Sequence, residues 1–535
     1  MSFDKNSRRE FLRVAGSGVA GAGIGASVRA GAQTGPSSSV GSGPTGSSVK
    51  SFGAAADGKT LDTVAVNQAI EAAGARGGTV FFPAGTYLCH SLHLKSNVGL
   101  HLERGATILA ADPSSSGSAP TYDAAEPNSF DQYQDFGHSH WRNSLIWGEG
   151  LENVSITGPG TIWGRGLSRG WGDGPKAEDP GVANKAISLK NCHNVTLRDF
   201  SILHGGHFGI LATGVDNLTI DNLIVDTNRD GMDIDCCRNV RVSNCSVNSP
   251  WDDGICLKSS FGLGFARATE GVTITNCYVT GDFEEGTLLD GTLKRFDPAA
   301  DVPRRGRIKF GTESNGGFKN IAVSNCVFDA CGGFALETVD GGLLEDVAIS
   351  NITMRDITNA PIFLRLGSRM RGPKDLQVGK LRRISISNLV CSNSASRQSS
   401  IISGVPDHEI EDIKLSHIFV EHRGDGTHAD AALDPPEKEA EYPEPDMFGP
   451  MPAHGFYIRH VRGLEMDHIE IKSLRGDARP AFYLKDVRDA DFLRIKVPQL
   501  FAAPSFALKD VEDFNLDLSR PLHDTHFDHA DDKKL

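Results

Sequence analysis

The sequence predicts an all-β protein built as a single parallel β-helix, a solenoid of short strands, with a short helix over its N-terminal end. Short segments that alternate apolar and polar residues recur along the chain, and several of them end in Asn or Asp. Equivalent apolar residues at Val195, Leu218 and Val240 are separated by 23 and 22 residues. Alternation indicates half-buried strands, and a regular period of this length without a helical partner indicates stacked coils. The leucine-rich repeat is the nearest alternative, but its LxxLxL pattern is absent.

Residues 1–32 are predicted to be a Tat export signal. The run SRREFL places two arginines before the Gly- and Ala-rich stretch VAGSGVAGAGIGASV, and Ala30, Gly31 and Ala32 offer a small-residue cleavage site. A disordered basic tail is the alternative. Residues 33–47, rich in Gly, Ser and Pro, are predicted to be a flexible linker. No other stretch of the sequence reaches the length of a membrane span. The mature protein is therefore expected to be soluble, without a membrane span, and either periplasmic or secreted from a bacterium.

Residues 48–520 are predicted to form the β-helix, followed by a polar tail at 521–535. A solenoid must cover its open end, and the helical spacing of 63–76 (TVAVNQAIEAAGAR) predicts such a cap. The strand pattern then occurs at 77–88, 98–109, 152–158, 193–199, 216–222, 238–244, 270–276, 319–325, 345–351, 382–388 and 411–417, and more weakly at 462–471 and 488–497. Residues 424–453, rich in Pro, Glu, Asp and Ala, predict a long inserted loop. We expect one domain and a monomer.

Composition and cysteine placement exclude several other classes. The formal net charge of −14 argues against a broad basic surface for nucleic acid. Four of the ten cysteines follow Asn in recurring contexts, which indicates small buried hydrophobes at one repeat position: Cys192, Cys245, Cys277 and Cys326. One or two disulfides remain an alternative, because the protein is expected to be exported. No CxxC or HExxH spacing is present, so neither a metal site nor a cofactor is predicted.

Three aspartates are the main candidates for chemistry. Asp230 (in TNRDGMDID) and Asp252 (in SPWDDGICLKSS) are 22 residues apart, one repeat period, and Asp253 follows directly. That spacing places them on neighbouring coils, about 4.8 Å apart in the stacking direction. Clustered carboxyls cannot all ionise easily, so one is expected to hold a proton beside ionised partners, as glycoside hydrolysis requires. Ordinary turn aspartates and a calcium site are the alternatives.

The order NRDGMDID, then PWDDGICLKSS, resembles the polygalacturonase family, glycoside hydrolase family 28, whose fold is a right-handed parallel β-helix of the pectin-lyase-like kind. The opening VKSFGAAADGKTLDTVAVNQAI is also similar to the start of pectin-degrading β-helices, and the likeness covers most of 48–420. The resemblance implies an inverting hydrolase with Asp252 as general acid. It implies that Asp230 and Asp253 activate the attacking water, and that Asn228 and Lys258 border the sugar subsite.

The chain departs from this family at three motifs. NTD is altered to Asn228-Arg229-Asp230, Arg305 falls near the histidine of GHG, and Ala335 and Glu337 occupy the positions of Arg and Lys in RIK. The resemblance implies that the missing groups grip a galacturonate carboxylate. Their replacement argues against a simple homogalacturonan hydrolase. Relatives that act on rhamnogalacturonan also depart here, so an acidic plant cell-wall polysaccharide of branched or mixed pectin type is the expected partner.

Further residues are candidates for substrate binding. Two basic clusters could hold a uronate bidentately, one containing Arg305 and Lys309 and the other containing Arg365. Glu313 and Glu337 stand in similar contexts, GTESNGG and LETVDGG, and are expected to point into the groove, with ladder ion pairs as the alternative. His207 lies one coil before Asp230 and is either a substrate contact or a packed histidine.

The sequence therefore predicts an exported glycoside hydrolase that acts on a pectic polysaccharide. A calcium-dependent polysaccharide lyase and a non-catalytic carbohydrate-binding β-helix are the alternatives. The lyase would need an arginine or lysine base near the acidic cluster.

Overall fold

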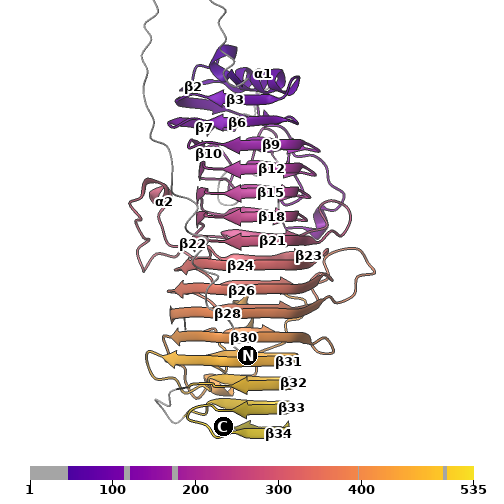
Figure 1. Cartoon of the computed structure of the whole chain (residues 1–535), viewed down its shortest axis with the longest axis vertical. Helices are drawn as coiled ribbons and strands as arrows, with labels where there is room; N and C mark the ends of the chain where they lie inside the picture. The colour runs from indigo at the N-terminus through magenta and orange to yellow at the C-terminus, as the bar shows by residue number, and fades with distance from the viewer. Residues whose placement is uncertain (1–45, 114–120, 136, 171–178, 396, 498–502) are drawn as a thin grey trace, which may run out of the picture. The chain divides into compact units, whose positions relative to one another are not determined.

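The computed structural model describes residues 46–113, 121–135, 137–170, 179–395, 397–497 and 503–535. These residues form stacked coils whose strands join in one large sheet, and nearly all the pairings are parallel (Figure 1). The prediction of a parallel β-helix is confirmed. The predicted Tat signal and residues 33–45 of the predicted linker lie outside the described residues. Within the described part of the chain, no helix is both long and apolar enough to cross a membrane.

The strands form three parallel ladders. The first contains β1 (Gly46–Ser48), β3 (Gly78–Phe82), β6 (Val98–Leu102), β9 (Glu152–Thr157), β12 (His193–Arg198), β15 (Asp216–Asp221), β18 (Arg238–Ser243), β21 (Thr269–Thr275), β24 (Phe318–Asp329), β26 (Leu343–Arg355), β28 (Lys380–Ser394), β30 (Ile410–His422), β31 (Phe456–Ser473), β32 (Phe482–Leu493) and β33 (Phe506–Asp517).

The second ladder contains β2 (Asp57–Leu61), β4 (Gly85–Cys89), β7 (Ala106–Ala110), β10 (Thr161–Trp163), β13 (Ser201–Leu203), β16 (Ile224–Asp226), β19 (Ser246–Asn248) and β22 (Tyr278–Thr280), and it continues in the second half of β24. The third contains β5 (Leu92–His93), β8 (Ile146–Glu149), β11 (Lys185–Lys190), β14 (Phe208–Thr213), β17 (Asp230–Asp235), β20 (Ile255–Ser259), β23 (Ile308–Ser314), β25 (Phe334–Thr338), β27 (Ile362–Leu366) and β29 (Ser400–Ser403), and it joins β31.

The repeat pattern of the sequence follows from what each position does in a coil. Inward residues such as Val195, Leu218 and Val240 pair in register on successive strands and are buried. The Asn residues of the recurring strand segments lie at backbone positions with φ between 53° and 57°, which Asn tolerates better than most residues. Their side chains also bond from coil to coil, at 2.8 Å between Asn217 and Asn194 and at 2.6 Å between Asn239 and Asn217. All ten cysteines are buried and free, so their interpretation as small hydrophobes is confirmed.

Both ends of the stack are covered. Helix α1 (Thr63–Gly74) buries Val66, Ala69, Ile70 and Ala73 over the first coil, so the predicted N-terminal cap is confirmed (Figure 1). At the other end, β34 (Thr525–Ala530) and β35 (Lys533–Lys534) pair antiparallel with β33. The prediction of a polar tail at 521–535 is therefore wrong. These strands occupy the last exposed edge of the sheet, which would otherwise offer unpaired backbone groups.

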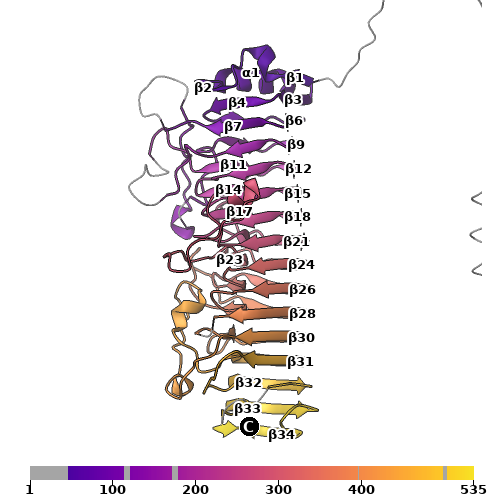
Figure 2. The ribbon, with the colours of Figure 1, turned by 90° about the vertical axis from the view of Figure 1, so that its left-hand side faces the viewer.

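Long connections gather beside the third ladder. The loop after β7 contains the 3₁₀ turn η2 (Asp131–Tyr133), and the loop after β30 contains η3 (Asp430–Ala432) and η4 (Pro445–Phe448). Figure 2 shows these purple and orange loops on the same side of the strands. The other short helices are η1 (Val49–Phe52) and α2 (Thr287–Asp290), of which α2 lies in the connection between β22 and β23.

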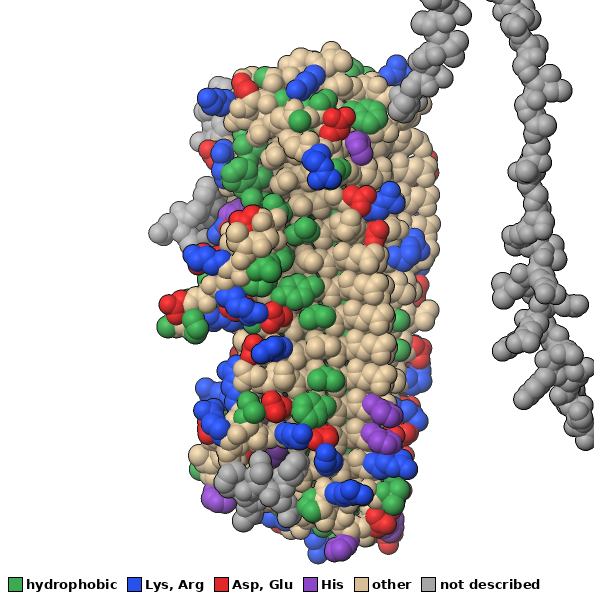
Figure 3. Space-filling view, turned by 60° about the vertical axis from the view of Figure 1, so that its left-hand side comes forward, with side chains coloured by type: hydrophobic (Ala, Val, Ile, Leu, Met, Phe, Trp, Pro, Cys, Tyr) green, Lys and Arg blue, Asp and Glu red, His purple; other side chains and the backbone are tan. Residues whose placement is uncertain are grey.

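The segment predicted as an inserted loop, 424–453, is ordered by packing against the solenoid. Its Phe448 and Met451 are buried in a cluster with Phe363, Ile401 and Tyr457. On the face drawn in Figure 3, basic and acidic side chains of the described residues are interspersed, with hydrophobic side chains scattered among them.

Candidate active site

The structure brings the three predicted aspartates together. Asp230 begins β17, whereas Asp252 and Asp253 lie in the connection that leads into β20. One carboxyl oxygen from each lies within 4.8 Å of the others. The register differs by one residue from the sequence expectation. Asp226 pairs with Asn248 but Met232 pairs with Ile255, because the connection before β20 is one residue longer than the one before β17. The residue level with Asp230 in the ladder is therefore Asp253, and Asp252 precedes it.

The aspartates open into a cavity of about 320 Å³. It is lined by Asp135, His138, Gly170, His207, Arg229, Asp230, Asp252, Asp253, Lys258 and Tyr442. Five of the residues predicted from the sequence therefore share one cavity, including Lys258 and His207. The other walls come from the loop after β7 and from the inserted loop 424–453. A cavity of this size with convergent polar groups has the properties of a site for a small sugar unit.

Arg229, which stands in place of the threonine of the NTD motif, bonds directly to one of the aspartates. Its Nη2 lies 2.6 Å from Asp252 Oδ2, and its Nη1 lies 3.3 Å from Nδ1 of His207. Burial, together with the charge of Arg229, lowers the pKa of His207 well below its ordinary value. His207 is therefore neutral and cannot supply a positive charge to the cavity. In the sequence, the only sign of these contacts is the arginine at position 229 of the altered NTD motif.

Two of the aspartates have pKa values shifted in opposite directions. Burial and the neighbouring Asp252 raise the pKa of Asp230 well above its ordinary value. For Asp253 burial acts in the same sense, but Arg307 and Lys309 outweigh it and lower the pKa of Asp253 below its ordinary value. A protonated and an ionised carboxyl thus lie side by side, which is the arrangement that acid–base chemistry needs. Burial and the charge of Asp252 therefore favour the protonated form of Asp230, whereas the family resemblance assigns the acid role to Asp252.

Asp253 is held by a cluster of cations that also binds a carboxylate from the inserted loop. Arg307 Nε donates to Asp253 at 2.7 Å, and Lys309 Nζ lies 3.4 Å from the other oxygen. On its far side Arg307 bonds to Glu444, which also accepts from Arg305 at 2.7 Å. Although burial opposes the shift, Arg307 and Lys309 lower the pKa of Glu444 to about 2, so it is ionised. Glu444 was missed from the sequence because an irregular loop has no period to place it.

A second charged network supports the opposite wall. Lys258 Nζ lies 3.1 Å from Glu313, whose other oxygen lies 2.9 Å from Arg371. His138 Nε2 lies 3.0 Å from Asp233. Burial and Lys258 oppose protonation of His138, but the nearby carboxylates of Glu313 and Asp233 raise its pKa above the ordinary value. Glu313 is thus a buried partner of Lys258 and does not line the cavity. Asp135 and His138 were not recognised in the sequence, where no motif marks them.

Six predicted binding residues do not line the cavity: Asn228, Arg305, Lys309, Glu313, Glu337 and Arg365. Arg365 is 1% exposed and donates to Ser403 and to the backbone oxygens of Glu437 and Lys438, so it holds the inserted loop instead of a uronate. This contradicts its expected role, because its donors are used by the protein. Arg305 is paired with Glu444. Asn228, the residue that precedes Arg229, is buried. Glu337 is also buried, and its Oε2 lies 3.7 Å from Lys309 Nζ.

The buried carboxyl of Glu337 is expected to make the stability of the protein depend on pH. Burial raises the pKa of Glu337 to about 8, whereas a glutamate in an unfolded chain has a pKa of about 4.3. Between these values the unfolded chain releases a proton that the folded protein keeps, so the free energy of unfolding falls as pH rises. Glu337→Gln removes this contribution. Its free energy of unfolding, relative to wild type, is expected to increase by roughly 1–3 kcal/mol from about pH 5 to pH 8, measured by denaturant titration.

The exposed Glu465, which pairs with Lys414 on the surface, offers the control substitution Glu465→Gln. That variant should follow the wild-type pH dependence. Parallel pH profiles for wild type and Glu337→Gln would show that the Glu337 carboxyl does not titrate between the two pKa values.

The three aspartates also have the donor atoms of a calcium site, and their oxygens are close enough to share an ion. Two of them already have cations as partners, since Asp252 pairs with Arg229 and Asp253 with Arg307 and Lys309. Calcium sites require an excess of negative charge. The charge balance of this cluster therefore favours acid–base chemistry over metal binding.

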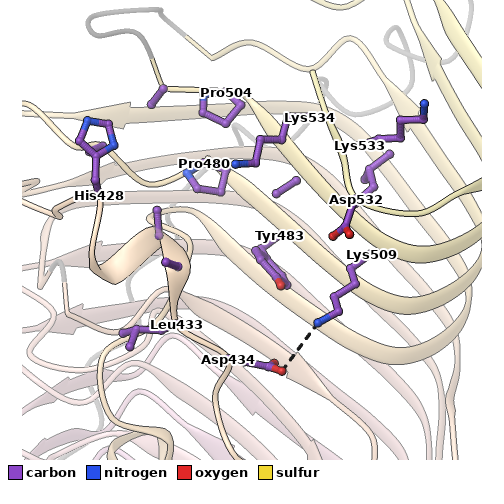
Figure 4. Close-up of a pocket in the computed structure, with 16 residues that line it drawn as sticks. His428, Leu433, Asp434, Pro480, Tyr483, Pro504, Lys509, Asp532, Lys533 and Lys534 are labelled. Carbon is purple, nitrogen blue, oxygen red and sulfur yellow. Dashed lines mark ion pairs between the residues drawn. The ribbon is translucent and has the colours of Figure 1, made fainter.

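A larger cavity, of about 680 Å³, lies several coils away, beside β32 and β33 (Figure 4). Tyr483 and Lys509 line it, and Lys509 Nζ lies 3.8 Å from Asp434. Asp434 also pairs with Lys485 at 2.7 Å. Asp434 and Asp532 are the acidic residues that line this cavity. Among the described residues they belong to no cluster of three close carboxyl groups like that of the smaller cavity. The smaller cavity is therefore the candidate active site.

The chain is similar to several known proteins. Residues 47–281 match the family model described as rhamnogalacturonase A/epimerase, pectate lyase-like. A probable polygalacturonase of Vitis vinifera is 24% identical over 402 residues, which cover 70% of this chain and 74% of that protein. Plasmin and fibronectin-binding protein A of Streptococcus pneumoniae is 33% identical over 185 residues, 33% of this chain and 24% of that protein. The structure of a family 28 exopolygalacturonase from Yersinia enterocolitica superposes with a TM-score of 0.61 at 20% identity, covering 84% of this chain and 79% of that one, which shows the shared fold.

Proposed function

We propose that this chain is a divergent member of the polygalacturonase family and that it hydrolyses glycosidic bonds in a pectic polysaccharide, which the matched family model and the similarity to a probable polygalacturonase support. The observation that carries the proposal is the set of three carboxyl groups within 4.8 Å of one another at one cavity. Burial raises the pKa of Asp230, whereas Arg307 and Lys309 lower the pKa of Asp253 despite its burial. Hydrolysis requires both a proton donor and a base, and this cluster provides both.

We assign the general acid to Asp252. Its side chain is 28% exposed, against 5% for Asp253, so it can reach a glycosidic oxygen in the cavity. Asp230 and Asp253 then hold the attacking water. Asp230 lies beside Asp252, with one carboxyl oxygen of each within 4.8 Å of the other. Asp253 stays ionised throughout, because two cations hold it.

Inversion at the anomeric carbon is part of the proposal. Inverting enzymes commonly separate their carboxyl groups by about 6.5–9.5 Å, and retaining enzymes by about 5–5.5 Å, so the closeness of the three carboxyls by itself favours retention. A retaining enzyme, however, needs a carboxylate free to attack the sugar. Both oxygens of Asp253 are engaged by Arg307 and Lys309, and burial disfavours the ionised form of Asp230 that would attack the sugar. Attack by a water that Asp253 activates and Asp230 helps to hold therefore fits these charges better.

The finer parts of the proposal concern substrate and location. Replacement of the GHG and RIK positions by Arg305, Ala335 and Glu337 supports a mixed pectin, such as a rhamnogalacturonan, over plain homogalacturonan. The twin arginine and the cleavage site at Ala30–Ala32 support export through the Tat pathway to the periplasm or beyond.

Mass spectrometry of the products tests the reaction type. The purified protein is incubated in EDTA with fragments of homogalacturonan and rhamnogalacturonan backbone. We expect saturated products, each cut adding one water, and no loss of rate in EDTA. Proton NMR of the first product is expected to show the inverted anomer. Unsaturated products would show a lyase, and loss of activity in EDTA would show a metal site. A lyase needs a basic side chain that can lose its proton and then act as the base. Although burial opposes the shift, the acidic groups around Lys258, including Glu313, raise the pKa of Lys258 well above its ordinary value, so Lys258 is poorly suited to that role.

A second candidate function is carbohydrate binding without turnover. The contact between Arg229 and Asp252 supports it, because the side chain assigned as the acid is already engaged by a cation. The partly similar streptococcal protein is named for binding plasmin and fibronectin and not for a hydrolase activity. Binding of a pectic fragment, with no cleavage of any fragment over a long incubation, would establish this alternative.

A further inference from the structure

Glu444 occupies a position where a substrate carboxylate would otherwise bind. Its Oε2 accepts from Arg305 Nη1 at 2.7 Å, while its Oε1 bonds to Arg307 and lies 3.4 Å from Lys309 Nζ. Three cations therefore converge on one carboxylate, as they would on a uronate. The Glu444 side chain is only 15% exposed, so it is desolvated as well as paired.

The loop that carries Glu444 is held firmly in place. Arg365 donates to the backbone oxygens of Glu437 and Lys438 at 2.9 and 3.0 Å. Arg459 donates to those of Pro435 and Pro436, both at 2.9 Å. Phe448, which follows Glu444 in the loop, is 4% exposed. A substrate that needed the three cations would have to displace a carboxylate fixed at both ends of its loop segment.

The cations of the cavity itself are also paired. Arg229 is bonded to Asp252 at 2.6 Å, and Lys258 to Glu313 at 3.1 Å. The lining meanwhile includes four aspartates: Asp135, Asp230, Asp252 and Asp253. A uronate in this cavity would bring a further negative charge close to these groups without a cation to receive it, and repulsion among like charges in a confined site is unfavourable.

We propose that the catalytic cavity accepts a neutral sugar and that Glu444 sets this specificity by neutralising Arg305, Arg307 and Lys309. The bond cleaved is then one in which the sugar in the cavity carries no carboxylate, and the uronates of the polysaccharide lie outside it. Tyr442, two residues before Glu444, lines the cavity with its ring 5.4 Å from Lys309 Nζ, so the same loop also supplies an apolar surface for the sugar face. The inference rests on the proposed function for the identity of the cavity as a sugar site.

Calorimetry with matched sugar pairs tests the proposal without requiring turnover. The ligands are the methyl glycosides of galactose and galacturonic acid, and of glucose and glucuronic acid, which differ only at C6. Wild type is expected to bind the neutral member of at least one pair roughly tenfold or more tightly than its uronate, as expected for one uncompensated charge. Glu444→Gln removes the carboxylate that the three cations share and is expected to tighten uronate binding by about tenfold or more.

The matched control is Glu441→Gln, in the same loop, where the exposed Glu441 pairs only with Lys438 at 3.5 Å. It should leave both affinities unchanged. Preference of wild type for a uronate, or no gain of uronate binding in Glu444→Gln, would overturn the proposal. If Glu444→Gln does not fold, the wild-type comparison decides alone. Failure of the hydrolase assignment is seen separately, as absence of products from every pectic fragment.

Discussion

Asp252→Asn is expected to lower kcat by roughly 10²- to 10⁴-fold and to leave KM within about threefold of wild type. Asn has the volume of Asp and can still accept the Arg229 hydrogen bond, which spans 2.6 Å in the native protein. It has no acidic proton to give to the leaving oxygen. The measurement is the initial rate on whichever pectic fragment the wild type cleaves, with circular dichroism to show that the fold is intact.

The control for this substitution is Asp407→Asn. Asp407 is exposed in a turn with φ of 63°, a conformation that Asn also adopts. Full activity there shows that loss of a surface charge has no effect. Turnover within a few fold of wild type in Asp252→Asn would refute its role. A greater loss in Asp230→Asn would then move the acid to Asp230, whose pKa is raised by burial and by Asp252.

Arg307→Met is expected to have the largest effect on stability, lowering the free energy of unfolding by roughly 3–5 kcal/mol. Arg307 is 1% exposed and bridges Asp253 and Glu444, so its removal leaves two buried carboxylates near each other with Lys309 as their shared cation. The pKa of Asp253 should rise toward its ordinary value, because Arg307 is the strongest influence lowering it. Denaturant titration measures the stability change.

The comparison is Arg383→Met, which removes an arginine paired with Glu345 and Asp346 on the surface, where its side chain is 40% exposed. Exposed pairs contribute only about 0–1 kcal/mol. Adding Glu444→Gln to Arg307→Met should recover part of the loss, because one buried charge is then removed. Equal destabilisation by Arg307→Met and Arg383→Met would contradict a structural role for the buried bridge.

Two sequence expectations failed at positions where the local pattern carries no spatial information. The last residues look polar, yet β34 and β35 pair with β33, because the final coil presents an edge that only folding creates. Arg365 stands in a basic cluster that suggested uronate binding, but it faces the backbone of the inserted loop. Neither outcome could be seen without knowing which loop lies over which coil.

The sequence by itself determined the coil architecture, the N-terminal cap and the gathering of Asp230, Asp252 and Asp253. These features are periodic or local, so the spacing of residues in the chain translates directly into position on a coil. Only the tertiary structure decided which charges surround the aspartates. Glu444 is 137 residues from Arg307, and Asp135 is 236 residues from Arg371. Such pairs come from long irregular loops, where no repeat links chain position to place, and their charges nevertheless set which carboxyl holds the proton and which sugar the cavity is proposed to admit.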